Sequence, residues 1–176
     1  MSDRLTLRDP TAQEYASYRT LVRDAYRDDL VTNGGHDAEE AAEKAARDTR
    51  DLLPEDGAPA DQVVKIADLD GKLAGYLWVG RGQIGDIAWV QDVVVEPELR
   101  GQGFGRELMA AAEGIAAELG YRRIGLNVMG GNVGAIRLYE SLGYTVMHQQ
   151  MSKDLAPAPT PEQSAPAPEQ SARPEG

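Results

Sequence analysis

The stretch VVVEPELRGQGFGRELMAAAEGIAAELG, residues 93–120, decides the fold of this chain. Its three consecutive valines predict a strand, because β-branched side chains favour extended backbone. Three glycines then fall within the five positions 101–105. Apolar residues at helical spacing follow, and Gly120 is typical of a helix end. A strand therefore passes through a glycine-rich turn directly into a helix.

The glycine turn has the physical character of an anion site. The first amides of a helix have no partner within the helix, and the helix dipole adds partial positive charge there. Phosphate is a typical ligand of such a terminus. Gly101, Gly103 and Gly105 lack a Cβ atom and so permit close approach to the backbone. Arg100 and Arg106 flank the turn and can pair with phosphate oxygens. The turn favours diphosphate binding, and the alternative is a merely tight connection.

Two common phosphate loops do not fit this turn. A dinucleotide-binding fingerprint needs G-x-G-x-x-G, with an acidic residue about 20 positions later. Here Arg106 follows Gly105, and Arg123 stands where the acidic residue is needed. A P-loop needs a G-K-[ST] sequence, which this chain lacks. Both of these nucleotide-binding classes are therefore excluded.

Outside this stretch, strand and helix periodicities alternate. Asp70 and Gly71, between two apolar runs, predict a β-hairpin. The element order β-α-α-β-β-β-α-β-α-β predicts an α/β fold of the α+β type, with a mixed, mostly antiparallel central sheet flanked by helices. The expected elements are a strand at Leu5–Arg8, a helix from Pro10 or Thr11 that carries Tyr15, Tyr18 and Tyr26, a helix over Ala38–Leu53, strands at Val63–Asp68, Leu73–Val79 and Ile84–Val95, a helix over Phe104–Leu119, a strand at Arg123–Val128, a helix over Val133–Leu142 and a last strand from about Tyr144.

Length and composition predict one globular domain and a tail. The chain has 176 residues, of which 41% are hydrophobic and 27% charged, as in globular proteins. We expect the folded domain over residues 1–155. Residues 156–176 consist almost entirely of Pro, Ala, Glu, Gln and Ser and repeat the sequence PEQSA, which is typical of a disordered tail. The absence of cysteine excludes disulfides and thiolate metal sites.

Charge and hydropathy exclude several kinds of partner. A net charge of −11 repels phosphate backbones, so we expect no nucleic-acid partner. No apolar run approaches the roughly 20 residues that span a bilayer. The first residues also lack the apolar block of a signal peptide. We therefore expect a cytoplasmic protein with no membrane association. His36 and His148 lie far apart in the sequence, so we expect no metal site.

The block from Trp89 to Tyr144 resembles the GNAT superfamily of acyl-CoA-dependent N-acetyltransferases. The pattern Arg100-x-x-Gly103-x-Gly105 is similar to the pyrophosphate loop of that family, after a strand that ends in V-x-V. Downstream, the stretch LNVMGGNVGAIRLYESLGY, residues 126–144, is similar to the family's second signature, N-x-x-A-x-x-L-Y-x-x-L-G-Y. The order and the separation of the two motifs also match, so the resemblance implies a GNAT-like fold.

The resemblance implies acetyl-CoA as the co-substrate. In the family, the V-x-V strand separates from the next strand near a bulge, and its unpaired backbone groups bond the pantetheine arm like an added strand. A nearby amide stabilises the oxyanion. Asn132 also suits the N-cap of the following helix. The residues that the resemblance implies for coenzyme binding are Val93, Val94, Val95, Arg100, Gly101, Gln102, Gly103, Gly105, Arg106 and Asn132.

The resemblance implies Tyr139 as the catalytic acid. After an amine attacks the thioester, the leaving thiolate needs a proton, and a phenol held beside the sulfur can donate it. Tyr139 shares a helical face with Ala135, Leu138 and Leu142, so a tyrosine of the core is the alternative.

The general base is less well defined by the sequence. Many family members place a glutamate on the strand before the V-x-V element, where this chain has Gln91. An amide cannot accept the proton, but Asp92 is next to it. Side chains alternate along a strand, so Asp92 points away from the Gln91 side unless a bulge intervenes. Glu96, His148 and His36 are further candidates, and a water chain is another.

Two functions remain open at this level. The first is transfer of an acetyl group from acetyl-CoA to a primary amine, which is either a small molecule or a peptide or protein α-amine. No nucleophile constellation is present, so direct attack in a ternary complex is favoured. The second is a non-catalytic acyl-CoA-binding regulatory module, because Gln91 replaces the expected base. The resemblance also allows a homodimer.

Overall fold

The structure is a computed structural model and describes residues 5–82, 86–151 and 153. The chain divides into two units, Met1–Thr145 and Val146–Gly176. The first unit holds every helix and strand of the described residues, and the described residues of the second unit form neither. The expected tail at 156–176 lies outside the described residues, so its disorder and the domain end at residue 155 stay predictions.

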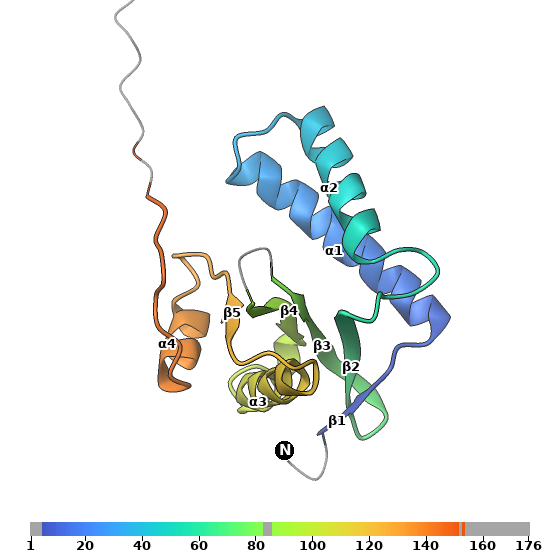
Figure 1. Ribbon diagram of the computed structural model, residues 1–176, viewed down its shortest axis with the longest axis vertical. Coiled ribbons are helices and arrows are strands. Elements are labelled where there is room, and N and C mark those ends of the chain that lie inside the picture. The colour runs from blue at the N-terminus through green and yellow to red at the C-terminus, as the bar shows by residue number, and fades with distance from the viewer. Residues whose placement is uncertain (1–4, 83–85, 152, 154–176) are drawn as a thin grey trace, which may run out of the picture. The chain divides into compact units, whose positions relative to one another are not determined.

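The first unit is built on a five-stranded sheet in the order β1-β2-β3-β4-β5 (Figure 1). The first four strands are antiparallel to their neighbours, and β5 is parallel to β4. The predicted fold class, a mixed and mostly antiparallel sheet with flanking helices, is confirmed. The elements are β1 (Leu5–Arg8), α1 (Ala12–Thr32), α2 (Ala38–Leu52), β2 (Gln62–Leu69), β3 (Lys72–Arg81), β4 (Ala88–Val95), the short 3-10 helix η1 (Pro97–Leu99), α3 (Phe104–Glu118), β5 (Ile124–Leu126) and α4 (Val133–Ser141).

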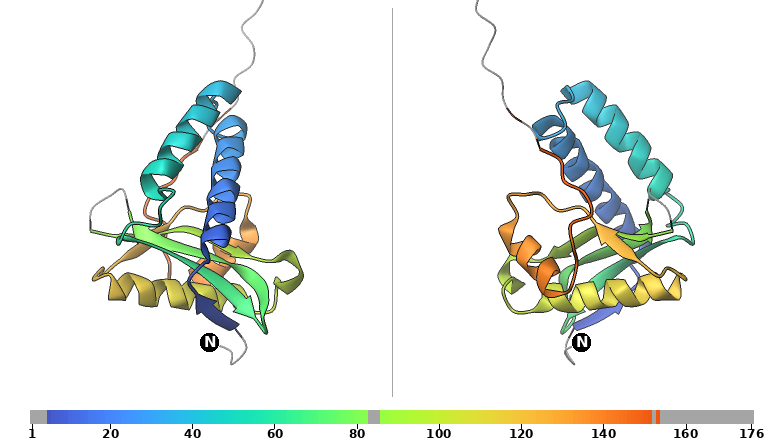
Figure 2. Two further views of the ribbon diagram at one scale, coloured as in Figure 1. Left: turned by 90° about the vertical axis from the view of Figure 1, so that its right-hand side faces the viewer. Right: turned by 60° about the vertical axis from the view of Figure 1, so that its left-hand side comes forward.

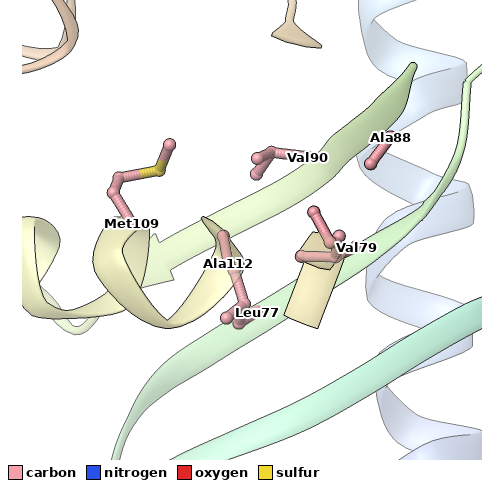
Figure 3. Close-up of a cluster of buried hydrophobic side chains, with 7 residues drawn as sticks. Leu77, Val79, Ala88, Val90, Met109 and Ala112 are labelled. Atoms are coloured by element: carbon pink, nitrogen blue, oxygen red, sulfur yellow. The ribbon is translucent and has the colours of Figure 1, made fainter. Parts of the chain in front are cut away.

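The two faces of the sheet carry different helices. Figure 2 shows α1 and α2 on one side and α3 on the other. The alternation along β3 explains both contacts, because successive side chains point to opposite faces. Leu77 and Val79 pack against Met109 and Ala112 of α3 (Figure 3). Trp78, between them, packs on the other face against tyrosines of α1. The sheet is therefore buried on both sides of β3.

Local signals in the sequence set the ends of the elements. Thr11 and Glu14 form a reciprocal capping box at the start of α1, and Asp37 caps α2. The predicted hairpin turn is confirmed. Asp70 and Gly71 both have positive φ, at 54° and 80°, as the tight turn between β2 and β3 requires.

Three predicted strand limits are wrong. The fourth strand begins at Ala88, opposite Arg81, the last residue of β3. Its predicted start at Ile84 lies outside the described residues, and Asp86 and Ile87 are not in a strand. The fifth strand covers only Ile124–Leu126, because its partner β4 bulges after the last paired position. The last strand, expected from Tyr144, is absent from the described residues 144–151. That stretch lacks the period-two alternation with which a strand buries one face.

No helix in the described part of the chain combines the length and the apolar character that a membrane span needs.

Candidate active site

Strand β4 contains a one-residue bulge at the predicted position of the base. The pairing with β3 passes from Val90 to Asp92, which leaves Gln91 as an extra residue. An extra residue reverses the face to which the following side chains point. Val90 packs in the core on the α3 side, whereas Asp92 contacts α1 on the other side. The Gln91 amide lies at the strand edge, where its Nε2 donates to the Arg81 carbonyl at 3.2 Å.

Asp92 is a half-buried residue whose carboxyl group has a tyrosine partner. The Tyr18 hydroxyl of α1 donates to Asp92 Oδ2 at 2.8 Å. Burial raises the pKa of Asp92, and the hydrogen bond from Tyr18 opposes part of that rise. A carboxyl group whose pKa is displaced toward neutrality is better matched to accepting a proton from an amine.

Tyr139 lies on α4 and packs against the core between β4 and α3. Burial raises the pKa of its phenol, and the charge of Asp92 raises it further. The phenol therefore stays protonated at neutral pH, as a proton donor must. Its ring lies 5.9 Å from the ring of Tyr144. The charge of Asp92 on β4 therefore reaches the phenol of Tyr139 on α4.

The two parallel strands separate beside these groups. The β4–β5 ladder consists of three pairs and ends at Val90, opposite Leu126. Val93, Val94 and Val95 continue to pair with β3 on one edge. In the described part of the chain, their other edge has no strand beside it. This is the separation that the resemblance implied, and it leaves a strand edge open to an extended ligand.

The glycine turn has the backbone geometry of an anion site. Gly101 and Gly103 have positive φ, at 75° and 93°, which explains why both are glycine. Gly103 is the N-cap of α3, and no side chain of the described residues caps the helix there. Close packing explains why residue 105 is also glycine, because a Cβ atom at that position would lie 3.1 Å from Leu138 Cδ2 of α4.

The polar side chains around the turn have partners within the protein. Arg100 Nε donates to the Val95 carbonyl at 3.0 Å. Gln102 Nε2 donates to the Glu98 carbonyl, also at 3.0 Å. Each of these bonds uses only one of the hydrogen-bonding groups that its side chain carries. Arg106 Nη2 donates to Ser141 Oγ at 2.6 Å. Asn132 caps α4 by accepting from the Ala135 amide at 3.1 Å, which confirms its expected role as an N-cap.

The remaining base candidates are not brought to this site by any described contact. Glu96 follows β4 as the N-cap of η1. His36 lies before α2, with Nδ1 3.6 Å from Glu40. His148 belongs to the second unit. No group of three or more potential metal ligands occurs among the residues that the structure describes.

One residue of the site was missed in the sequence. The sequence predicts for Tyr18 only a place on the first helix, yet its hydroxyl group reaches Asp92 across 74 positions of the chain. The only available signal was the series of tyrosines at helical spacing, whose hydroxyl groups need partners when buried.

Comparisons with known proteins agree with this geometry. A family model described as "Acetyltransferase (GNAT) family" matches residues 19–144. The chain is similar to YdgE of Bacillus subtilis, an uncharacterized N-acetyltransferase, with 25% identity over 85% of this chain and 98% of that one. It is 31% identical to the streptothricin acetyltransferase of Streptomyces lavendulae, over 64% of this chain and 53% of that one. The crystal structure of YycN from Bacillus subtilis superposes with a TM-score of 0.74 at 26% identity, over 86% and 99% of the two chains.

The chain belongs to the GNAT family of acetyltransferases. The prediction of an acetyl-CoA-dependent N-acetyltransferase is therefore confirmed at the level of the family.

Proposed function

We propose that the chain transfers the acetyl group of acetyl-CoA to a primary amine by direct attack in a ternary complex. The observation that carries the proposal is the end of the β4–β5 ladder at Val90, beside Asp92 on β4, with the Tyr139 phenol of α4 close enough to respond to the charge of Asp92. The carboxylate of Asp92 can accept the proton that the amine loses, and the phenol of Tyr139 carries the proton that the leaving thiolate needs.

Asp92 accepts the proton that the acceptor ammonium must lose before its nitrogen can attack the thioester carbon. The bond between that carbon and sulfur then breaks, and Tyr139 donates its proton to the departing sulfur. The nitrogen loses its second proton as the amide forms, and this proton returns the phenolate to a phenol. Asp92 then releases its proton to solvent, and no covalent acyl-enzyme is required.

The coenzyme would be held by backbone groups more than by side chains. The open edge of Val93–Val95 suits the amides of the pantetheine arm, in the manner of an added strand. The uncapped amides after Gly103 suit the diphosphate, together with Gly101 and Gly105. Side chains that complete this proposed set are Arg100, Gln102, Arg106 and Asn132.

The acceptor is proposed only as a class. The streptothricin acetyltransferase is named for a small molecule. The sequence resemblance also includes acetylation of peptide α-amines, so both kinds of amine belong in the test. A homodimer stays a prediction.

Binding of CoA gives the first test. A ligand at 100 times its dissociation constant is expected to stabilise the protein by about 2.7 kcal/mol, because it binds only the folded state. The shift in melting temperature between the free protein and the protein with saturating CoA measures this effect. An unmoved melting temperature would show that the coenzyme assignment is wrong.

Release of free thiol from acetyl-CoA gives the second test, with a panel of small amines and N-terminal peptides. The proposal expects turnover with at least one class of acceptor. Tight CoA binding without turnover for any acceptor would instead favour the non-catalytic acyl-CoA-binding module.

A further inference from the structure

The hydrogen bond between Tyr18 and Asp92 joins two layers of the domain. Tyr18 is only 1% exposed, and its ring stacks on Tyr76 of β3 with centroids 5.0 Å apart. It also packs in a cluster with Tyr15 and Trp78. The ring is therefore held on several sides, which fixes the direction of the hydroxyl group. The hydroxyl group donates a hydrogen bond to Asp92 Oδ2 at 2.8 Å.

We propose that Tyr18 is a positioning residue for the general base, which holds the Asp92 carboxylate in its charged, proton-accepting form. This inference rests on the proposed function and assigns α1 a part in the chemistry. A carboxylate has two oxygens with about four acceptor positions. One bond from Tyr18 therefore leaves the capacity to accept a proton from the amine.

The chemistry of the two groups decides which of them donates the hydrogen bond. Burial raises the pKa of Tyr18 well above its ordinary value, and the charge of Asp92 raises it further. Tyr18 thus stays a donor at every pH at which the enzyme would work, and Asp92 is the acceptor. A donor of this kind stabilises the charged carboxylate over the neutral acid.

A test must separate the effect of Tyr18 on the pKa of Asp92 from the effects of the other neighbouring groups. The backbone amide of Val93 lowers the pKa of Asp92, but less than Tyr18 does. From α4, Tyr139 faces the same charge. From β3, Tyr76 acts on Tyr18 and itself responds to the charges of Glu96 and Glu14. Among the described residues, Tyr18 is the side chain with a hydrogen bond to Asp92, and Tyr18→Phe removes that bond by deleting one oxygen atom.

The experiment compares Tyr18→Phe with Tyr15→Phe. Both tyrosines lie on α1 in the same cluster, and the Tyr15 hydroxyl donates to the Pro54 carbonyl at 3.1 Å instead of to Asp92. Each variant therefore loses one hydroxyl group and one hydrogen bond from the same helix. The measurement is the pH dependence of kcat/KM for acetylation of one acceptor, so that the titration of the acceptor is common to all variants.

Loss of the donor raises the pKa of Asp92, so the acid limb of the profile should move to higher pH in Tyr18→Phe. The expected displacement is about one pH unit, since a hydrogen bond to a charged group stabilises that charge by at least this much. Activity should recover at pH values above the displaced limb. In Tyr15→Phe, the limb should stay at its wild-type position.

A purely structural role for Tyr18 predicts a different result, in which activity falls by the same factor at every pH and the limb does not move. That result, or an equal displacement in Tyr15→Phe, would overturn the inference. If Asp92→Asn retains the wild-type limb, the base is another group. The inference about Tyr18 then fails, while turnover still supports the acetyltransferase.

A readout without turnover separates the two proposals. Carbon-13 NMR can follow the carboxyl titration of Asp92, identified by the signal that disappears in Asp92→Asn. The pKa from this titration should rise in Tyr18→Phe and stay unchanged in Tyr15→Phe, even if no acceptor has been found. An unchanged Asp92 titration in Tyr18→Phe would refute the inference, whatever the result of the acceptor panel.

Discussion

Replacement of Gly103 by valine is expected to abolish CoA binding and to leave the domain folded. Gly103 has a φ of 93°, and a β-branched residue there carries backbone strain of about 1–3 kcal/mol. Most domains have a stability of roughly 5–15 kcal/mol and tolerate such a loss. The added methyl groups would occupy the approach to the first amides of α3, where the diphosphate is proposed to bind. Titration calorimetry with CoA measures the effect directly.

Gly120→Val is the matched control. Gly120 follows the other end of α3 and has a φ of 88°, and a Cβ atom at either glycine meets nothing within 4 Å. The two variants should therefore lose comparable stability in thermal unfolding, and only Gly103→Val should lose CoA. If Gly103→Val binds CoA as tightly as the wild type does, the diphosphate does not lie at this turn. An equal loss of binding in both variants would show a general effect of strain.

Tyr139→Phe is expected to lower kcat by about 10²–10⁴-fold, the typical contribution of a general acid. The affinity for CoA should change little, because the phenol is proposed to act on the sulfur after attack. Thiol release at saturating concentrations of both substrates measures kcat, and calorimetry measures the affinity for CoA.

Tyr144→Phe gives the control for this substitution. The ring of Tyr144 lies 5.9 Å from that of Tyr139. Its hydroxyl group is buried, and its pKa is raised by this burial and by the charge and a hydrogen bond of the nearby Glu113. Removal of this hydroxyl should leave kcat within a few-fold of the wild type. An equal fall in both variants would indicate disturbed packing, and wild-type kcat in Tyr139→Phe would remove the phenol from the mechanism.

Much of the fold could be predicted because its signals are local. Thr11 and Glu14 form the capping box at the predicted start of a helix, and Asp70 and Gly71 adopt the positive φ of the predicted hairpin turn. The glycines at 101 and 103 marked the left-handed turn before α3. Each of these features depends on a few neighbouring residues, which explains why the sequence was sufficient.

The sequence shows the bulge only as a break in alternation. Val90 and Val93 enclose two consecutive polar residues, Gln91 and Asp92. Only the pairing with β3 shows that Gln91 is the extra residue. The contact with Tyr18 depends on that bulge and on packing between segments 74 residues apart. The face of the sheet on which Asp92 lies therefore depends on long-range register, which local patterns do not encode.

The contact between α3 and α4 has a consequence for the choice of acyl donor. Leu138 closes against Gly105, and Arg106 is bonded to Ser141, so the helix that begins at the glycine turn is joined to the helix that carries Tyr139. In the proposed complex, this contact fixes the distance between the diphosphate at the glycine turn and the thioester beside Tyr139. Truncated thioesters that carry the same acetyl group but lack the nucleotide would reach the phenol without that anchorage. The domain should therefore discriminate between acyl donors by their length as well as by their chemistry.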